Sequence, residues 1–576
     1  MSVLAVKKRS NIIRNNKIEN KNICKKCSGE LDEFFTCKSC GNNSYITAKQ
    51  RILHISDKNT FKELKLDKVD ISKKCNYEDK IIKAQESTNL DEAIIIGTCN
   101  IDGRKVVLGV MDSKFMMGTL SVSVGETITK AFEYATDEKL PVILFCASGG
   151  ARIQEGLYSL VQMAKINAAI KKHSDKGLLY ISCLTNPTMG GVTASFGLFG
   201  DINIAEKNSQ IGFAGKSIIE NLYNEKLDSN FQTEEYNEKN GMIDIIADRK
   251  EIRNILVDLL KMINNNEKLV KVSREEEKIS DTNNNLLEIL KNVRDIDRFK
   301  GKDYLINIFD KYIELKGDRI SSNDSSILSG IGYIDNKSFI FNIQNKGRTL
   351  KENEDTNYGL TRPEGYRKAL RISKLAEKFN IPIINIIDSA GADPSIYSEE
   401  NGQAKAIADC LYTFSDLKTI IISIVVGEGS SGGALALSVC DWVGMLKHSI
   451  YTVISPEAYL KIMRKEEKVS NELLKSMRFT AQDLYEDKII DEVIDENEDL
   501  DFNVKNIKDF ILDKYDDLRK KDLQELIRNR YERIRNWDIA VRRMIKWGLL
   551  YLQVKVMNIV VWQKSYMRVM SMPKTL

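Results

Sequence analysis

The chain has 576 residues, more than one ordinary hydrophobic core requires, so two or three domains are expected. Hydrophobic residues make up 42% and charged residues 29%, and 86 basic groups nearly balance 82 acidic ones, which excludes a strongly basic field of the kind that binds nucleic acid. No signal-peptide core opens the chain and no uncharged apolar run reaches about 18 residues, so we expect a cytoplasmic protein without a membrane span.

Four cysteines stand close together near the start of the chain. They follow a basic leader, residues 1–20, and lie within the segment 21–45 as two Cys-x2-Cys pairs separated by nine residues. Two thiolate pairs on tight turns suit a closed tetrahedral zinc site. The sequence therefore predicts a structural zinc ribbon with the ligands Cys24, Cys27, Cys37 and Cys40. A nucleic-acid-binding ribbon, assisted by the leader, is the other interpretation.

Apolar strands and helical stretches alternate through residues 46–250, the first half of the remaining chain. Three runs are typical of buried strands, at 105–112, 140–147 and 178–186, and two runs are typical of helices, at 124–139 and 154–173. A glycine-rich turn follows the third strand. This succession predicts an α/β layered domain.

A second half with the same succession follows a linker. Residues 251–290 are charged and rich in Asn, which indicates the linker, and residues 291–540 form the second half. There, "IISIVV" predicts a buried strand, "GEGSSGG" a bare turn, and "ALAL" the start of a helix. Residues 541–576 form a basic and apolar tail. Its break in composition favours an appended segment, and a membrane or partner segment is the alternative.

Special residues recur between the halves at an offset of 240 to 242. Ser148 corresponds to Ser389, and Asp201 corresponds to Asp441. On the same offset Gly190-Gly191 pairs with Gly432-Gly433. The sequence therefore predicts that one structural unit occurs twice.

Each half carries two glycine-bearing turns that follow strands about 41 residues apart. Converging backbone amides can hold a developing oxyanion without any side chain. The candidates in the two halves are Gly150, Ala151, Gly190 and Gly191, and Gly391, Ala392, Gly432 and Gly433. Close helix–strand packing is the other interpretation of these glycines. No Gly-Lys-Ser/Thr follows these turns, and only three histidines exist, which disfavours a Walker-type phosphate loop and a histidine triad.

These residues resemble a known family, the carboxyltransferase of bacterial acetyl-CoA carboxylase, with a β-like half fused before an α-like half. The β-like stretch includes the four-cysteine ribbon, "SGGARIQEG" and "TMGGVTASFGLFGDINIAE". The α-like stretch includes "NKGRTLKEN", "RPEGYRKALRISKLAEKF" and "GEGSSGGALAL". The resemblance covers roughly residues 20–500 and implies two tandem crotonase-like domains, each a ββα superhelix.

The resemblance implies transfer of a carboxyl group from carboxybiotin to acetyl-CoA, which gives malonyl-CoA for fatty acid synthesis. The first-half turns would hold the acyl-CoA oxygen and the second-half turns the biotin oxygen. Arg152, Lys346 and Arg348 are candidates for contacts with CoA or biotin. The implied partners are a biotin carboxyl carrier protein, a biotin carboxylase and a second copy of the chain, equivalent to α2β2. The sequence contains no "MKM" biotinylation motif and no ATP-binding loop, so biotin and ATP chemistry must come from partners.

Some residues depart from the family pattern beside the second-half turns. The usual "GEGGSGG" is "GEGSSGG", which places Ser430 at a usual glycine, and "TPGAYPG" is "SAGADPS", which introduces Ala390, Asp393 and Ser395. These departures concern the substrate or the rate. The alternatives are a carboxyltransferase or biotin-dependent decarboxylase for another acyl-CoA, and a nucleic-acid-binding regulator that is not an enzyme.

Overall fold

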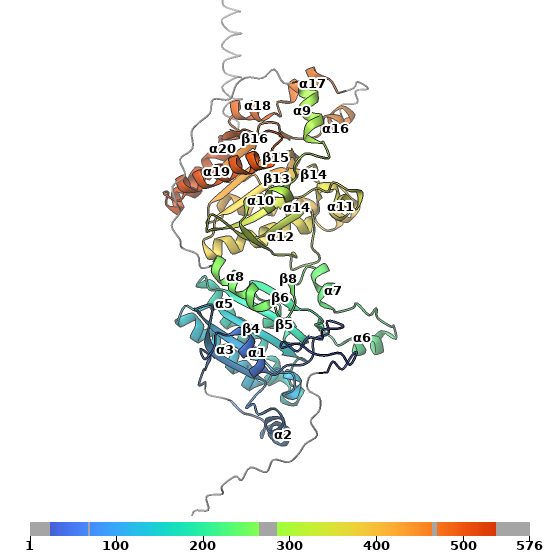
Figure 1. Cartoon of the computed structure of the whole chain (residues 1–576), viewed down its shortest axis with the longest axis vertical. Helices are drawn as coiled ribbons and strands as arrows, with labels where there is room; N and C mark the ends of the chain where they lie inside the picture. The colour runs from blue at the N-terminus through green and yellow to red at the C-terminus, as the bar shows by residue number, and fades with distance from the viewer. Residues whose placement is uncertain (1–22, 67–68, 264–284, 463–468, 537–576) are drawn as a thin grey trace, which may run out of the picture.

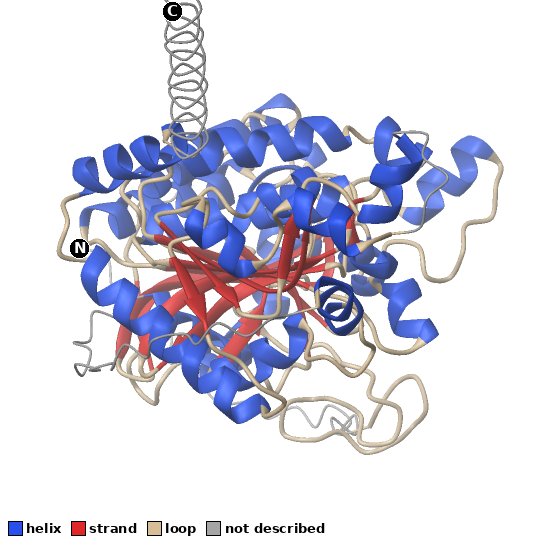
Figure 2. Cartoon of the chain, turned by 90° about the horizontal axis from the view of Figure 1, so that it is seen from above, coloured by secondary structure: helices blue, strands red, loops and turns tan. Residues whose placement is uncertain are grey.

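The computed structural model describes residues 23–66, 69–263, 285–462 and 469–536. The predicted leader, residues 1–20, and the predicted tail, residues 541–576, lie outside these residues. Two α/β units are stacked along the long axis of the molecule (Figure 1), with the first half coloured blue to green and the second green through yellow to red. Seen from above, the strands lie centrally with helices on both sides (Figure 2). The predicted α/β class is confirmed.

The first half is built on an eight-stranded sheet in the order β1-β2-β3-β4-β5-β6-β8, with β7 paired to β5. Its strands are β1 (Lys62–Glu63), β2 (Ile94–Ile101), β3 (Arg104–Met111), β4 (Val142–Ser148), β5 (Tyr180–Met189), β6 (Ile202–Glu206), β7 (Ile211–Gly212) and β8 (Ile245–Ala247). Its helices are α1 (Ala48–Ile55), α2 (Glu78–Thr88), α3 (Val122–Asp137), α4 (Leu157–Leu160), α5 (Gln162–Asp175), α6 (Lys216–Tyr223), α7 (Glu234–Lys239) and α8 (Ile252–Ile263).

The second half repeats this sheet strand for strand, in the order β9-β10-β11-β13-β15-β16-β18, with β17 paired to β15. The strands are β9 (Lys311–Glu314), β10 (Ile327–Ile334), β11 (Lys337–Gln344), β13 (Ile383–Ser389), β15 (Ile421–Ser430), β16 (Trp442–Leu446), β17 (Ile450–Thr452) and β18 (Glu492–Ile494), and β12 (Leu360–Thr361) pairs separately with β14 (Gly391–Ala392). The predicted duplication is therefore confirmed at the level of topology.

The second half carries further helices around its sheet. They are α9 (Leu286–Val293), α10 (Gly301–Ile308), α11 (Leu350–Asp355), α12 (Pro363–Phe379), α13 (Ile396–Glu400), α14 (Gln403–Asp416), α15 (Ser431–Leu435), α16 (Pro456–Ile462), α17 (Asn471–Met477), α18 (Ala481–Glu486), α19 (Leu500–Leu518) and α20 (Leu523–Arg535). α12 starts at Pro363, where a missing N–H costs nothing, and is followed by Asn380 in the left-handed conformation.

The two sheets share one hydrophobic core. A single cluster of buried side chains contains Val107 and Ile143 of the first half together with Ile383 and Val425 of the second. Ion pairs also cross the junction: Lys378 Nζ lies 2.7 Å from Asp201 Oδ1, and Arg371 donates to Asp244. The halves therefore pack as one body.

Two of the predicted elements differ from the structure. The helix expected at 154–173 is broken at Gly156, whose φ of +58° is left-handed, so α4 and α5 begin only after it. The bare turn expected at "GEGSSGG" is mostly strand, because β15 continues to Ser430 by pairing with β17. Sequence periodicity does not register either event, since one depends on a single dihedral angle and the other on a distant strand.

Candidate active site

The first turn of each half is held by a serine at the end of a strand. Ser148 Oγ accepts a hydrogen bond from the Gly150 amide at 3.0 Å, and Ser389 Oγ accepts one from the Gly391 amide at 3.0 Å. The φ angles of Gly150 and Gly391 are +116° and +136°, which side chains rarely adopt. The two halves therefore build the same turn from the same residue types.

The residue after this turn presents a backbone amide. In the first half, Leu120 N donates to Gly150 O and Arg152 N donates to Leu120 O, both at 2.8 Å. This pattern skips Ala151, whose amide forms no hydrogen bond with any described residue. In the second half, Asp393 N donates to Thr361 O at 2.9 Å, so the Ala392 amide points away from β12 in the same way.

The second turn of each half is a left-handed corner where a strand ends. Gly190 occupies the corner in the first half with a φ of +59°, and Ser431 occupies it in the second with a φ of +58°. The strand register agrees, because Ser148 lies opposite Thr188 and Ser389 lies opposite Gly429. Gly190 therefore corresponds to Ser431, and the predicted pairing of Gly190-Gly191 with Gly432-Gly433 was wrong by one residue.

This register also explains the unusual serine at position 430. Ser430 lies in β15 with a φ of −121°, an extended conformation open to any residue. A Cβ there causes no backbone strain, so the departure from the family pattern is compatible with the turn.

Only part of the predicted set of amides remains available. The Gly190 amide donates to Gly212 O at 3.1 Å and to Phe213 O at 3.0 Å, and the Gly150 and Gly391 amides donate to serine hydroxyls. The remaining amides are those of Ala151 and Gly191 in the first half, and of Ala392, Gly432 and Gly433 in the second. Gly432 and Gly433 lie in the first turn of α15, so their amides precede any acceptor within that helix.

The two turns of each half are in contact. A Cβ built on Gly191 would lie 3.8 Å from Ala151 N, and one built on Gly433 would lie 2.6 Å from Ala392 N. The approach at Gly433 is possible only because glycine has no side chain, whereas a Cβ on Gly191 would make an ordinary van der Waals contact with Ala151. The two interpretations of the glycines are thus compatible. The glycines permit the two turns to pack together, and this packing brings the remaining backbone amides close to one another.

The three predicted cations each pair with a carboxylate of the protein, and the Arg152 and Lys346 pairs are buried whereas that of Arg348 is partly exposed. Arg152 is fully buried and forms a paired interaction with Glu92, at 2.9 and 2.7 Å. Lys346 contacts Asp388 and Glu428, and Arg348 contacts Asp303 at 2.6 Å. Their assignment to CoA or biotin stays a prediction.

The acidic partners of Lys346 were not predicted. Asp388 and Glu428 both lie near the carboxyl end of a mostly apolar strand, and both are buried. Burial lowers the pKa of Lys346, but the carboxylates of Asp388 and Glu428 outweigh it and raise this pKa overall. Burial raises the pKa of Asp388, and Lys346 outweighs it in the opposite direction. The signal was present in the sequence, as an acid that ends the runs "IINIID" and "IISIVVGE".

The four cysteines of the ribbon converge. Their Sγ atoms all lie within 4.8 Å of one another, and three Sγ–Sγ distances are 3.3, 3.4 and 3.7 Å. Tetrahedral zinc with bonds of about 2.3 Å requires sulfur atoms roughly 3.8 Å apart. The donor set therefore fits zinc.

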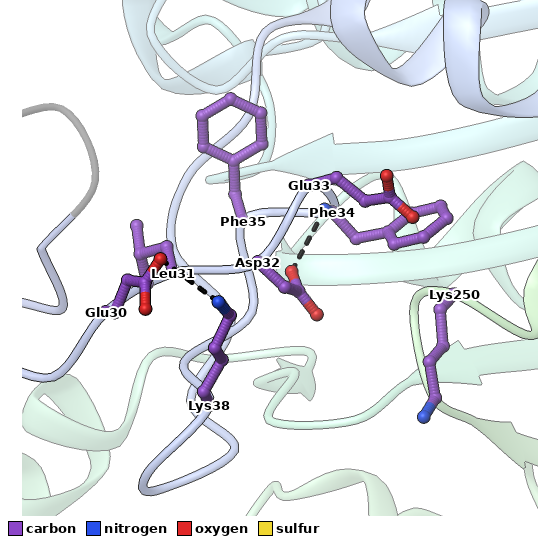
Figure 3. Close-up of a pocket in the computed structure, with 8 residues that line it drawn as sticks. All are labelled: Glu30, Leu31, Asp32, Glu33, Phe34, Phe35, Lys38 and Lys250. Carbon is purple, nitrogen blue, oxygen red and sulfur yellow. Dashed lines mark hydrogen bonds and ion pairs between the residues drawn. The ribbon is translucent and has the colours of Figure 1, made fainter.

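A hollow of about 540 Å³ lies on the ribbon, apart from the glycine turns (Figure 3). It is lined by Glu30, Leu31, Asp32, Glu33, Phe34, Phe35, Lys38 and Lys250. Lys38 pairs with Glu30, and the Phe34 amide donates to Asp32. Some of its charged groups thus already have partners within the ribbon.

No helix in the described part of the chain is long and apolar enough to cross a membrane.

Comparison with known proteins gives consistent results for most of the chain. The family described as acetyl co-enzyme A carboxylase carboxyltransferase-like matches residues 237–538. The acetyl-coenzyme A carboxylase carboxyl transferase subunits beta/alpha of Natranaerobius thermophilus are 44% identical over 533 residues, and the same protein of Clostridium tetani is 43% identical over 516; each match covers 87% of this chain and 88% of the relative. The transcarboxylase 12S structure, at 20% identity, aligns with a TM-score of 0.65 over 83% of this chain and 90% of that one, which shows a shared fold.

Proposed function

This chain belongs to the acetyl-CoA carboxylase carboxyltransferase family in its fused beta/alpha form, and from this we propose that it transfers a carboxyl group from carboxybiotin to acetyl-CoA. The product is malonyl-CoA. The observation that carries the proposal is that each half has two turns at the ends of two parallel strands. The two halves match, and in each the turns present backbone amides that are not used in the hydrogen bonds described above. A reaction that develops negative charge on two different oxygens needs two such sites.

Negative charge develops on two oxygens during the reaction, and one proton is transferred. Cleavage of the bond between the ureido nitrogen and the carboxyl group of carboxybiotin releases CO2 and leaves the electron pair on the ureido group. That group takes a proton from the methyl of acetyl-CoA, and the resulting enolate attacks CO2. Amides held in place by the fold stabilise both anions without reorganisation, and the loss of one such donor costs roughly 10²–10³ in rate.

We assign the acyl-CoA oxygen to the first half and the biotin oxygen to the second. In the first half the donors are the amides of Ala151 and Gly191. In the second they are the amides of Ala392 and Gly432, with Gly433 beside them. This assignment follows the family resemblance, in which the β-like half holds the acyl-CoA oxygen and the α-like half holds the biotin oxygen.

The ribbon holds one structural zinc ion through Cys24, Cys27, Cys37 and Cys40. Four thiolates leave no open position on the metal, so the ion stabilises the fold and takes no part in the chemistry. Arg249 connects the ribbon to the first half, since it donates to Phe34 O and Ser44 O and pairs with the buried Glu206. We expect one zinc per purified chain by elemental analysis, and its loss in Cys37→Ser.

The donor and its regeneration come from partners, which we propose to be a biotin carboxyl carrier protein and a biotin carboxylase in the cytoplasm. The chain also associates with a second copy of itself. Large apolar side chains lie exposed near the turns in both halves, among them Ile153 (84% exposed), Phe213 (70%), Ile396 (79%) and Val453 (77%). Exposed apolar surface of this kind is typical of protein interfaces.

The reverse reaction tests the function directly. The purified chain is given malonyl-CoA and free biotin, and the formation of acetyl-CoA is measured. Gly191→Val and Gly433→Val should each lower kcat at least 10²-fold, because their side chains fill the contact between the two turns. Competition by longer acyl-CoAs identifies the preferred acyl group. Inactivity of the wild-type chain with every acyl-CoA tried would contradict the proposal.

A further inference from the structure

Three charged side chains meet beneath the turns of the second half. Lys346 follows β11, Asp388 is the penultimate residue of β13, and Glu428 lies near the end of β15. Lys346 Nζ is 2.8 Å from Asp388 Oδ1 and 3.3 Å from Glu428 Oε2. The side chains are 13%, 3% and 9% exposed, respectively, so they are nearly withdrawn from solvent. One ammonium group thus joins the two strands that carry the two turns.

The charged group lies where the sheet is irregular. The register of β13 against β15 shifts between Ile387 and Ser389, so regular pairing is interrupted at Asp388. The carboxylate of Asp388 compensates by accepting a hydrogen bond from the Glu428 amide at 3.1 Å. Ser389, the next residue, holds the first turn, and the corner at Ser431 follows Glu428 by three residues.

The first half has the same interruption of strand pairing but supports it with uncharged side chains. Its register shifts between Cys146 and Ser148, at Ala147. There the hydroxyls of Thr185 and Thr188 donate to Cys146 O at 2.7 and 2.9 Å. The second half has Val426 and Gly429 at the positions of these threonines, so the hydroxyl clamp is absent from its strand.

Other charged groups around Lys346 have partners of their own. Arg294 shares Glu428 at 3.3 Å and also pairs with Glu457. Arg298 pairs with Glu496, and Arg348 pairs with Asp303. Lys300 lies close enough for Asp388 and Lys346 to influence its pKa, which burial lowers, and its Nζ donates to Asp295 O. Among the described residues, Lys346 is the cation that forms an ion pair with Asp388.

We propose that Lys346 is a positioning residue for the second oxyanion site, and that it fixes the ends of β13 and β15 instead of contacting a substrate. The proposal rests on the proposed function, because its readout is the carboxyl transfer. A positioning role predicts a loss in kcat with little change in the KM for biotin, the substrate assigned to this half, or in the KM for malonyl-CoA. A displacement of about 1 Å in such a site costs on the order of 10² in rate.

The test compares Lys346→Met with the double variant Lys346→Met/Asp388→Asn in the reverse reaction. The single variant leaves Asp388 buried without its cation, so kcat should fall about 10²-fold. Asparagine keeps an oxygen that can accept from the Glu428 amide and removes the charge, so the double variant should recover at least tenfold of this loss. Lys378→Met is the matched control: it breaks a lysine–aspartate pair at a strand end of the other half, and its kcat should stay within threefold of wild type.

The pH profile separates positioning from substrate contact. Without Lys346, burial raises the pKa of Asp388 above its ordinary value. The neutral carboxyl then forms below that raised pKa, so the activity of Lys346→Met relative to wild type should increase as pH falls. The double variant should lack this increase.

Several outcomes would overturn the proposal. One is a raised KM for biotin or malonyl-CoA with unchanged kcat in Lys346→Met. Another is a double variant that folds but is as inactive as the single variant. If the single variant does not fold, the double variant and Lys346→Arg decide: wild-type KM with at least a tenth of wild-type kcat in the double variant supports positioning. Inactivity of the wild-type chain itself would contradict the proposed function, a result distinct from failure of the Lys346 proposal.

Discussion

The two halves have closely matched backbones at the site but support them with different side chains. Ser148 and Ser389 hold their turns in the same way, and the corners at Gly190 and Ser431 have φ angles within one degree of each other. The support beneath is a pair of threonines in one half and a buried ion cluster in the other. The geometry of the turns is a property of the backbone here, so the side chains around it were free to diverge.

The aspartates at matching positions show the same divergence. Asp201 and Asp441 each accept a hydrogen bond from a backbone amide at the start of a neighbouring strand, Tyr180 N and Ile421 N, at 2.8 Å. The cation facing Asp201 is Lys378, from the opposite half. The cation facing Asp441 is Arg530, from α20 of its own half. One aspartate therefore joins the halves, and the other anchors the last described helix.

The largest expected effect comes from removing the cation that faces Asp441. Arg530 is 1% exposed and also donates to the carbonyls of Phe414, Leu417 and Thr419. Arg530→Met leaves a buried carboxylate and three carbonyls without this partner, and should cost about 3–5 kcal/mol in the free energy of unfolding. Urea unfolding followed by circular dichroism measures it.

Lys378→Met provides the comparison for that variant. Its ion pair is more exposed, at 13% and 12%, so water can replace part of the interaction and the loss should be smaller. Equal losses in the two variants would contradict the view that the two aspartates have different structural roles.

Much of this architecture could be predicted from sequence. Runs such as "IISIVV" are buried on both faces, which parallel central strands require, and the duplicated serines and glycines preserved the order of the elements. The cysteine spacing predicted a cluster that the structure brings together. These features are local, or they repeat.

The remaining features depend on contacts between distant segments. β15 extends to Ser430 because β17 pairs with it, and the register of β15 then decides that Ser431, and not Gly432, forms the corner. Arg152 was a candidate for a ligand contact, but Glu92, 60 residues away in the chain, faces it in the structure. No pattern within one segment contains these partners.

The second prediction concerns two adjacent glycines of the second half. A Cβ on Gly433 would lie 2.6 Å from Ala392 N and 2.7 Å from Gly391 C, both backbone atoms that cannot move independently. A Cβ on Gly432 would meet only Ile407 Cγ2, at 3.8 Å. Gly433→Ala should lower kcat of the reverse reaction by about 10²-fold, through displacement of the turns. Gly432→Ala should stay within about threefold, because it keeps its amide and has room for the methyl group. A larger loss in Gly432→Ala would show that the turns tolerate less than their geometry indicates.

The smallest effect tests the one corner where the halves use different residue types. Ser431 has a left-handed φ, which costs a residue with a Cβ roughly 1 kcal/mol relative to glycine, and its twin Gly190 avoids this cost. Ser431→Gly should therefore raise the free energy of unfolding by up to about 1 kcal/mol, less the entropy that glycine loses on folding. Gly190→Ser should have the opposite sign and a larger size, because a Cβ there would also lie 3.0 Å from Gly150 Cα. Thermal unfolding of both variants measures the pair. If Ser431→Gly is destabilising, the serine side chain must make a compensating contact, and the two corners are equivalent in backbone geometry alone.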